Sequence, residues 1–99
     1  ALGALGEAKR IEVDTSFYKG NSPANCSVQA QNAEWGTDQS LITQSMFWPE
    51  LLTPKDLVPD TIHKFELKDL EKIGPVSHVK LNIFPDGGIS RFRVFGSKL

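Results

Sequence analysis

The sequence predicts an all-β protein, an antiparallel β-sandwich or jelly roll. Three observations indicate this class: short runs in which apolar and polar residues alternate, turn-forming residues between them at fairly regular spacing, and very little helical periodicity. The chain has 99 residues, which suffices for one small domain at most. We therefore expect residues 1–99 to form a single domain or part of one.

Two strands are predicted in the first third of the chain. In residues 9–15, Ile11 and Val13 alternate with charged residues, as on a strand with one buried face. Residues 16–23 contain Gly-Asn and Ser-Pro pairs and should form an ordered loop. Residues 25–30 alternate again, which predicts a second strand.

The middle of the chain, residues 31–59, loses this periodicity while keeping several large apolar side chains. Pro49, Pro54 and Pro59 argue against a long helix or a central strand here. We expect a long excursion with a short strand at residues 41–47. A further strand is predicted at 61–67 and a helical turn at 68–73, stopped by Gly74-Pro75.

The C-terminal stretch, residues 78–96, has two alternating runs on either side of Pro85-Asp86-Gly87-Gly88. Turn residues of this kind between alternating runs favour a β-hairpin. In the implied register Lys80 lies opposite Arg93, Asn82 opposite Arg91, and His78 opposite Phe95. One hairpin face would then bury apolar residues, and the other would present the cations beside His78.

Like charges across a strand pair repel each other, so this cationic face needs a counter-charge. Two sources are open. A small carboxylated ligand could be held by the guanidinium and ammonium groups. Alternatively, Glu12 and Asp14 on a neighbouring strand could neutralise them and leave a solvated polar face.

The composition of the chain restricts its possible partners, cofactors and cellular location. The 11 basic and 12 acidic residues give a net charge of −1, so we expect neither a nucleic acid nor a membrane partner. With one cysteine, Cys26, no internal disulfide can form, and a cytoplasmic location is favoured. The two histidines have no ligand spacing, so no metal and no cofactor is expected. Because the first residue is alanine, we expect a piece of a longer protein.

Two blocks of this sequence resemble the allantoicase repeat. The longer is residues 78–96, His-Val-Lys-Leu-Asn-Ile-Phe-Pro-Asp-Gly-Gly-Ile-Ser-Arg-Phe-Arg-Val-Phe-Gly, and the second is residues 11–23, which is similar to an Asp-Thr, Gly-Asn, Pro block of that family. They occur in the expected order, and the resemblance suggests the C-terminal part of one repeat. Residues 31–72 match only loosely.

The resemblance implies a jelly roll similar to galactose-binding domains, and an enzyme that hydrolyses allantoate to ureidoglycolate and urea in purine degradation. It also implies a second repeat in the parent chain. Separately, the exposed edges of a truncated sheet predict self-association, so we expect a homo-oligomer. Carried over by position, the catalytic candidates are Asp14 and His78. The substrate-binding candidates are Asn21, Lys80, Asn82, Asp86, Arg91 and Arg93.

By this resemblance, Lys80, Arg91 and Arg93 would hold the substrate carboxylate, and Asn82 would bond a ureido group. Asp14 or His78 would move protons to or from water and the leaving nitrogen. Two other readings stay open: a non-catalytic ligand-binding or scaffold module, and a structural half that packs against another repeat.

Overall fold

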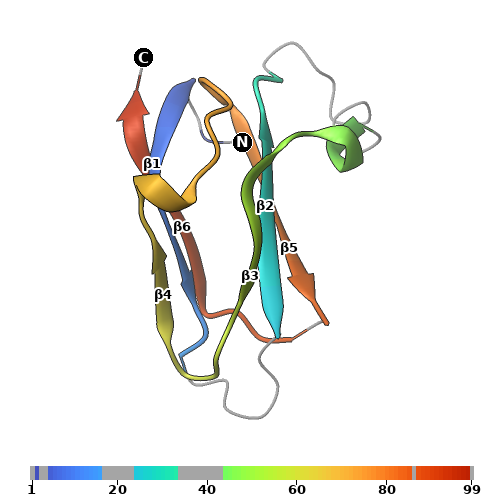
Figure 1. The fold of residues 1–99 in the computed structure, drawn as a ribbon, viewed down its shortest axis with the longest axis vertical. Coiled ribbons are helices and arrows are strands. Elements are labelled where there is room, and N and C mark those ends of the chain that lie inside the picture. Colours follow the sequence, from blue (N-terminus) through green and yellow to red (C-terminus); the bar gives the residue numbers. More distant parts are fainter. Residues whose placement is uncertain (1, 3–4, 17–23, 34–43, 86, 99) are drawn as a thin grey trace.

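The computed structural model describes residues 2, 5–16, 24–33, 44–85 and 87–98, which fold into two packed three-stranded antiparallel sheets (Figure 1). The first sheet has the order β4 (Ile62–Phe65), β1 (Gly6–Asp14), β6 (Arg91–Lys98). The second has the order β3 (Glu50–Asp56), β2 (Asn25–Gln31), β5 (His78–Phe84). Two short 3₁₀ helices are added, η1 (Ser45–Phe47) and η2 (Leu67–Asp69). The predicted all-β antiparallel sandwich is confirmed.

The central strands of the two sheets are the two strands predicted from alternation near the N-terminus. On β1, Ile11 and Val13 are fully buried, and on β2 the same holds for Cys26, Val28 and Ala30. These side chains belong to one apolar cluster between the sheets, with Leu51 and Leu52 of β3. Burial of these apolar side chains stabilises the fold by roughly 25 cal/mol for each Å² of apolar surface removed from water.

The predicted C-terminal hairpin is wrong. β5 pairs with β2, placing Asn82 opposite Ser27 and Lys80 opposite Gln29, whereas β6 lies in the other sheet and pairs with β1. Pro85, Gly87 and Gly88 therefore lie between strands of different sheets and not in a hairpin turn. Each alternating run has an apolar face, and placing the two runs in opposite sheets lets both faces pack on the shared core.

The middle of the chain also departs from expectation. Of the predicted strand at 41–47, residues 41–43 lie outside the described residues, and Ser45–Phe47 form η1 instead. The strand in this region is β3, which contains Pro54. β3 is an edge strand, and Pro54 lies in the register shift between the Cys26–Lys55 and Val28–Leu52 pairs; an edge strand and a bulge are the places where a sheet accepts proline.

Later elements lie close to their predicted positions. β4 covers residues 62–65 within the predicted 61–67, and η2 at 67–69 overlaps the start of the predicted turn at 68–73. Gly74 has φ +79°, in keeping with the expected chain break there. In the described part of the chain, no helix is both long and apolar enough to cross a membrane.

Candidate functional site

The structure separates the predicted cations. Lys80 alternates with Val79 and Leu81, which pack on the core, so Lys80 lies on the outer face of the β3-β2-β5 sheet. Arg93 lies between Phe92 and Val94, which also pack on the core, and so belongs to the outer face of the other sheet. The two outer faces of a sandwich point in opposite directions. The prediction that Lys80, Arg91 and Arg93 share one surface is therefore wrong.

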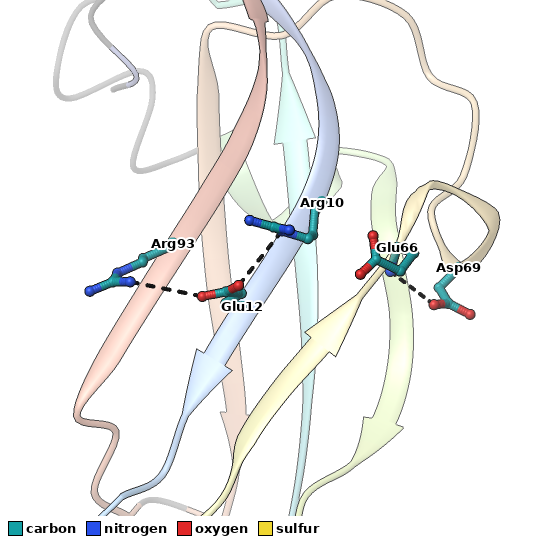
Figure 2. A network of polar contacts seen from close by, with 5 residues as sticks. All are labelled: Arg10, Glu12, Glu66, Asp69 and Arg93. Atoms are coloured by element: carbon teal, nitrogen blue, oxygen red, sulfur yellow. Dashed lines mark hydrogen bonds and ion pairs between the residues drawn. The ribbon is translucent and has the colours of Figure 1, made fainter.

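Arg93 takes part in a charge network across β1 and β6 (Figure 2). Its Nη1 lies 3.9 Å from Oε1 of Glu12, and Nε of Arg10 lies 3.6 Å from Oε2 of the same carboxylate. The Arg10 guanidinium also stacks over Phe95, 4.3 Å from the ring centroid. For Arg93, this is the neutralisation by a neighbouring acid that the sequence left open as an alternative.

Figure 2 also shows the polar pair at η2. The backbone N–H of Glu66 donates to Oδ2 of Asp69 at 3.0 Å, as part of a capping box at the start of this short helix. The arrangement satisfies backbone donors at the helix start. It gives these two acids a structural function.

Asp14 and Arg91 lie at the end of the sandwich where β1 finishes and β6 begins, and they are paired across the two strands. Hydrogen bonds from the Ser16 side chain and backbone lower the pKa of Asp14, and the positive charges of Arg91 and Arg93 act in the same direction, against partial desolvation. A carboxylate held ionised is a weak proton acceptor but a good hydrogen-bond acceptor. Predicted Asn21 and Asp86 lie outside the described residues.

His78, Lys80 and Asn82 come together on the outer side of β5, next to Ser27 and Gln29 of β2. We call these five residues the β2–β5 polar face. Asn82 Nδ2 donates to Gln29 Oε1 at 3.0 Å and lies 3.5 Å from Ser27 Oγ. Apart from buried Ser27, all of them are half-buried, so this is a partly desolvated polar surface on the outer side of the β3-β2-β5 sheet.

The segment around η1 is attached to this face. Gln29 Nε2 donates to the backbone carbonyls of Met46 and Trp48, at 3.1 and 3.0 Å. Lys80 Nζ donates to Ser45 Oγ at 3.4 Å, and none of the ion pairs among the described residues includes Lys80. An ammonium group without a carboxylate partner there is a candidate anion ligand.

His78 lies at the end of the same face. Its Nδ1 is 2.8 Å from Ser77 Oγ, and its ring meets buried Trp48 edge-on at 6.0 Å between centroids. These two contacts fix the ring orientation. A fixed imidazole beside a polar surface can exchange protons with a bound molecule.

Ser27 and Gln29 did not stand out in the sequence. They alternate outward on the predicted strand at residues 25–30, so their side of the sheet was predictable. Their contact with Asn82 depends on the pairing of β2 with β5, which joins segments that local pattern does not connect.

Other chemistry has little support in the described residues. They hold no group of three or more His, Cys, Asp or Glu side chains placed to bind a metal ion. Burial raises the pKa of the Cys26 thiol to about 11, so this sulfur stays protonated and acts as a small apolar side chain.

The fold and this surface describe a β-sandwich with a polar face suited to a small anionic ligand. The model of the allantoicase repeat matches residues 1–99, and the chain belongs to that family. The sequence resemblance to this family is thereby confirmed.

Named relatives agree with this assignment. The chain is 53% identical over 96 residues to probable allantoicase 2 of Burkholderia pseudomallei, covering 97% of this chain and 28% of that protein. It is 52% identical over 96 residues to the probable allantoicase of Stutzerimonas stutzeri, with 97% and 29% covered. The chain thus spans a little over a quarter of the length of these relatives.

A solved structure agrees as well. The crystal structure of allantoicase from Saccharomyces cerevisiae superposes with a TM-score of 0.73 and is 33% identical, covering 96% of this chain and 25% of that chain. A second allantoicase structure gives a TM-score of 0.72 at the same identity, over 95% of this chain and 25% of that one.

Proposed function

We propose that this chain is part of an allantoicase that hydrolyses allantoate to ureidoglycolate and urea in purine degradation. The observation that carries the proposal is the match to the allantoicase repeat over residues 1–99. The strong identity to proteins named allantoicase supports it. The chain would contribute binding surface to a larger enzyme.

The reaction sets requirements for the site. Water adds its oxygen to the central carbon of allantoate, the bond from that carbon to one ureido nitrogen breaks, and the nitrogen leaves as urea after gaining a proton. The substrate carries one carboxylate and two ureido groups rich in N–H donors. A suitable site therefore needs a cation, hydrogen-bond acceptors and a group that transfers protons.

The β2–β5 polar face offers one of each. Lys80, which has no acid partner among the described residues, would hold the carboxylate. Asn82 would accept a hydrogen bond from a ureido N–H. His78, oriented by Ser77 and Trp48, would pass a proton to the leaving nitrogen.

The other candidates enter the proposal differently. Asp14, with its lowered pKa, suits the binding of ureido N–H groups better than the removal of a proton from water. Arg91 beside it would attract the anionic substrate. Arg93 is already paired with Glu12, and we propose no direct substrate contact for it. Asn21 and Asp86 stay proposed ligand residues on the resemblance alone.

We also propose a second allantoicase repeat in the parent chain and a homo-oligomeric enzyme. The greater length of the relatives supports the first. The second is supported by β5 and β6, which are edge strands of the two described sheets and offer backbone groups for further pairing. Buried, unpaired Cys26 suits a reducing cytoplasm, which we keep as the proposed location.

The test uses the full-length protein that carries this sequence. Incubation with allantoate should release urea and ureidoglycolate in equal amounts, measured by a urease-coupled assay and chromatography. Saturable binding of allantoate with no urea released would instead favour the non-catalytic module. Absence of both binding and turnover would contradict the proposal.

A further inference from the structure

Gln29 occupies a central position in the β2–β5 polar face, because every hydrogen-bonding atom of its side chain is used. Its Nε2 has two hydrogens and donates to two backbone carbonyls, those of Met46 and Trp48, at 3.1 and 3.0 Å. Carbonyl oxygens only accept hydrogen bonds, so they fix which end of the Gln29 amide faces them. Its Oε1 must then point toward β5.

The orientation of the Gln29 amide determines the orientation of the Asn82 amide. Since Gln29 Oε1 is an acceptor, the Asn82 atom that meets it at 3.0 Å must be the donor Nδ2. The same Nδ2 lies 3.5 Å from Ser27 Oγ, so both of its hydrogens are directed at β2. The amide oxygen Oδ1 is left as the atom that Asn82 can present to a ligand.

We infer that Gln29 is a positioning and specificity-determining residue. Through two successive amide orientations, it makes Asn82 present a hydrogen-bond acceptor beside the Lys80 ammonium. A ligand of this surface must therefore combine an N–H donor with an anionic group, as ureido acids and N-acyl amino acids do. A simple carboxylate or phosphate would gain only the Lys80 interaction.

The inference deepens the proposed function and relies on it only for the identity of the natural ligand. Lys80 and Asn82 are two residues apart on one strand, so their side chains point to the same side. They can therefore contact the two ends of one small molecule.

The test compares two probes by isothermal titration with the full-length protein: N-carbamoylglycine, which has a ureido group and a carboxylate, and acetate, which has the carboxylate alone. Asn82→Leu should weaken binding of N-carbamoylglycine roughly tenfold, about the effect of one lost hydrogen bond. Gln29→Met, which frees Asn82 to rotate, should weaken it about threefold or more. Binding of acetate should stay unchanged in both variants.

Gln31→Met is the matched control, since Gln31 is exposed and lies two residues along the same strand without a contact to Asn82. It should change neither affinity. Equal losses for both probes in Gln29→Met, or no loss for N-carbamoylglycine in Asn82→Leu, would overturn the inference.

A direct measurement covers the case in which Gln29→Met does not fold. In the wild-type protein, nuclear Overhauser effects should place both Nδ2 hydrogens of Asn82 next to protons of Ser27 and Gln29. Effects that place them away from β2 would overturn the inference.

The experiments distinguish failure of the proposed function from failure of this inference. If N-carbamoylglycine binds and depends on Asn82 and Gln29 while allantoate yields no urea, the function fails and the inference stands. If urea is released and the Gln29→Met and Asn82→Leu proteins keep wild-type KM, the inference fails and the function stands.

Discussion

The backbone N–H of Ser90 donates a hydrogen bond to the backbone carbonyl of Asp14 at 2.7 Å. This bond joins the end of β1 to the start of β6 and so connects the two sequence blocks that resemble the allantoicase repeat. The Ser90 hydroxyl also bonds the carbonyl of Ser16. The Asp14 carboxylate is thereby held next to Ser16 and Arg91, which explains its electrostatic environment.

Asp14→Asn should make stability less dependent on pH in the acid range. Because folding lowers the pKa of Asp14 from 3.8, its ionised form stabilises the folded state at neutral pH, and this contribution is lost as the pH falls below about 4. The variant should unfold at a lower urea concentration than wild type at pH 7, and the difference should shrink toward pH 2. A constant difference across that range would contradict the prediction.

Gly96→Ala should disrupt the pairing of β1 with β6. A Cβ atom at position 96 would lie 2.0 Å from the Glu7 carbonyl oxygen and 2.9 Å from its carbon, and both are backbone atoms that move only if the strands separate. We expect a loss of about 3 kcal/mol in the free energy of unfolding, at the upper end for overpacking. Urea titration would measure this loss.

Ser97→Ala is the control for this experiment, since the neighbouring residue is exposed on the same strand. It should change stability by no more than about 0.5 kcal/mol. A Gly96→Ala protein as stable as wild type would show that the two strands are further apart than described.

The sequence could predict the strands that form the core of this sandwich, because alternation on β1 and β2 follows directly from burial of one face. It could also predict that Lys80, Asn82 and His78 share a face, since they lie at every second position of one strand. The positions of the other cations, Arg91 and Arg93, relative to this face could not be predicted in this way. Whether Arg91 and Arg93 join them depends on which sheet β6 enters, and alternation is the same in either sheet.

The turn signal at residues 85–88 was misleading for a related reason. Proline and glycine indicate that the chain changes direction, and they do so for a hairpin and for a crossover between sheets alike. What decides between them is the long-range pairing of β5 with β2 and of β6 with β1. In the observed pairings the apolar sides of both strands pack on one core.

Lys80→Met should raise KM for allantoate in the full-length enzyme by roughly tenfold or more, as expected for loss of a hydrogen bond to a charged group. Lys64→Met removes the same charge from the opposite outer face, where Lys64 lies opposite Glu12 in the register of β4 and β1, and should leave KM unchanged. Steady-state kinetics with a urease-coupled readout would measure both.

Arg93→Met is the informative third variant in that series. Arg93 was a substrate-binding candidate from the sequence, but it pairs with Glu12 on the face opposite Lys80. We expect little change in KM. A steep rise for Arg93→Met with none for Lys80→Met would reverse the assignment.

Self-association is expected for the isolated chain. β5 and β6 are edge strands of the two described sheets, and Phe84 at the end of β5 is 55% exposed. Sedimentation velocity should give an average mass that rises with protein concentration. A single monomer mass over a wide concentration range would contradict this expectation.

Thr15 and His63 should be energetically coupled, because both hold the segment around Val58. Fully buried Thr15 donates from Oγ1 to the Val58 carbonyl at 2.8 Å and accepts from the Thr61 N–H at 3.0 Å. His63 accepts the Val58 N–H at Nε2, at 2.9 Å, and donates from Nδ1 to the Val13 carbonyl at 3.1 Å. One neutral tautomer satisfies both contacts of the ring.

Thr15→Val and His63→Phe should each lower the free energy of unfolding by about 1–3 kcal/mol, because each leaves backbone groups without partners. The free energy of unfolding of the double variant should fall by at least about 0.5 kcal/mol less than the sum of the two single losses. Once one substitution has released the segment, the second substitution removes contacts that are already weakened. Thr53→Val on edge strand β3 is the control, with an expected change of about 0.5 kcal/mol or less. Additive losses in urea titration would show that the two side chains hold the segment independently.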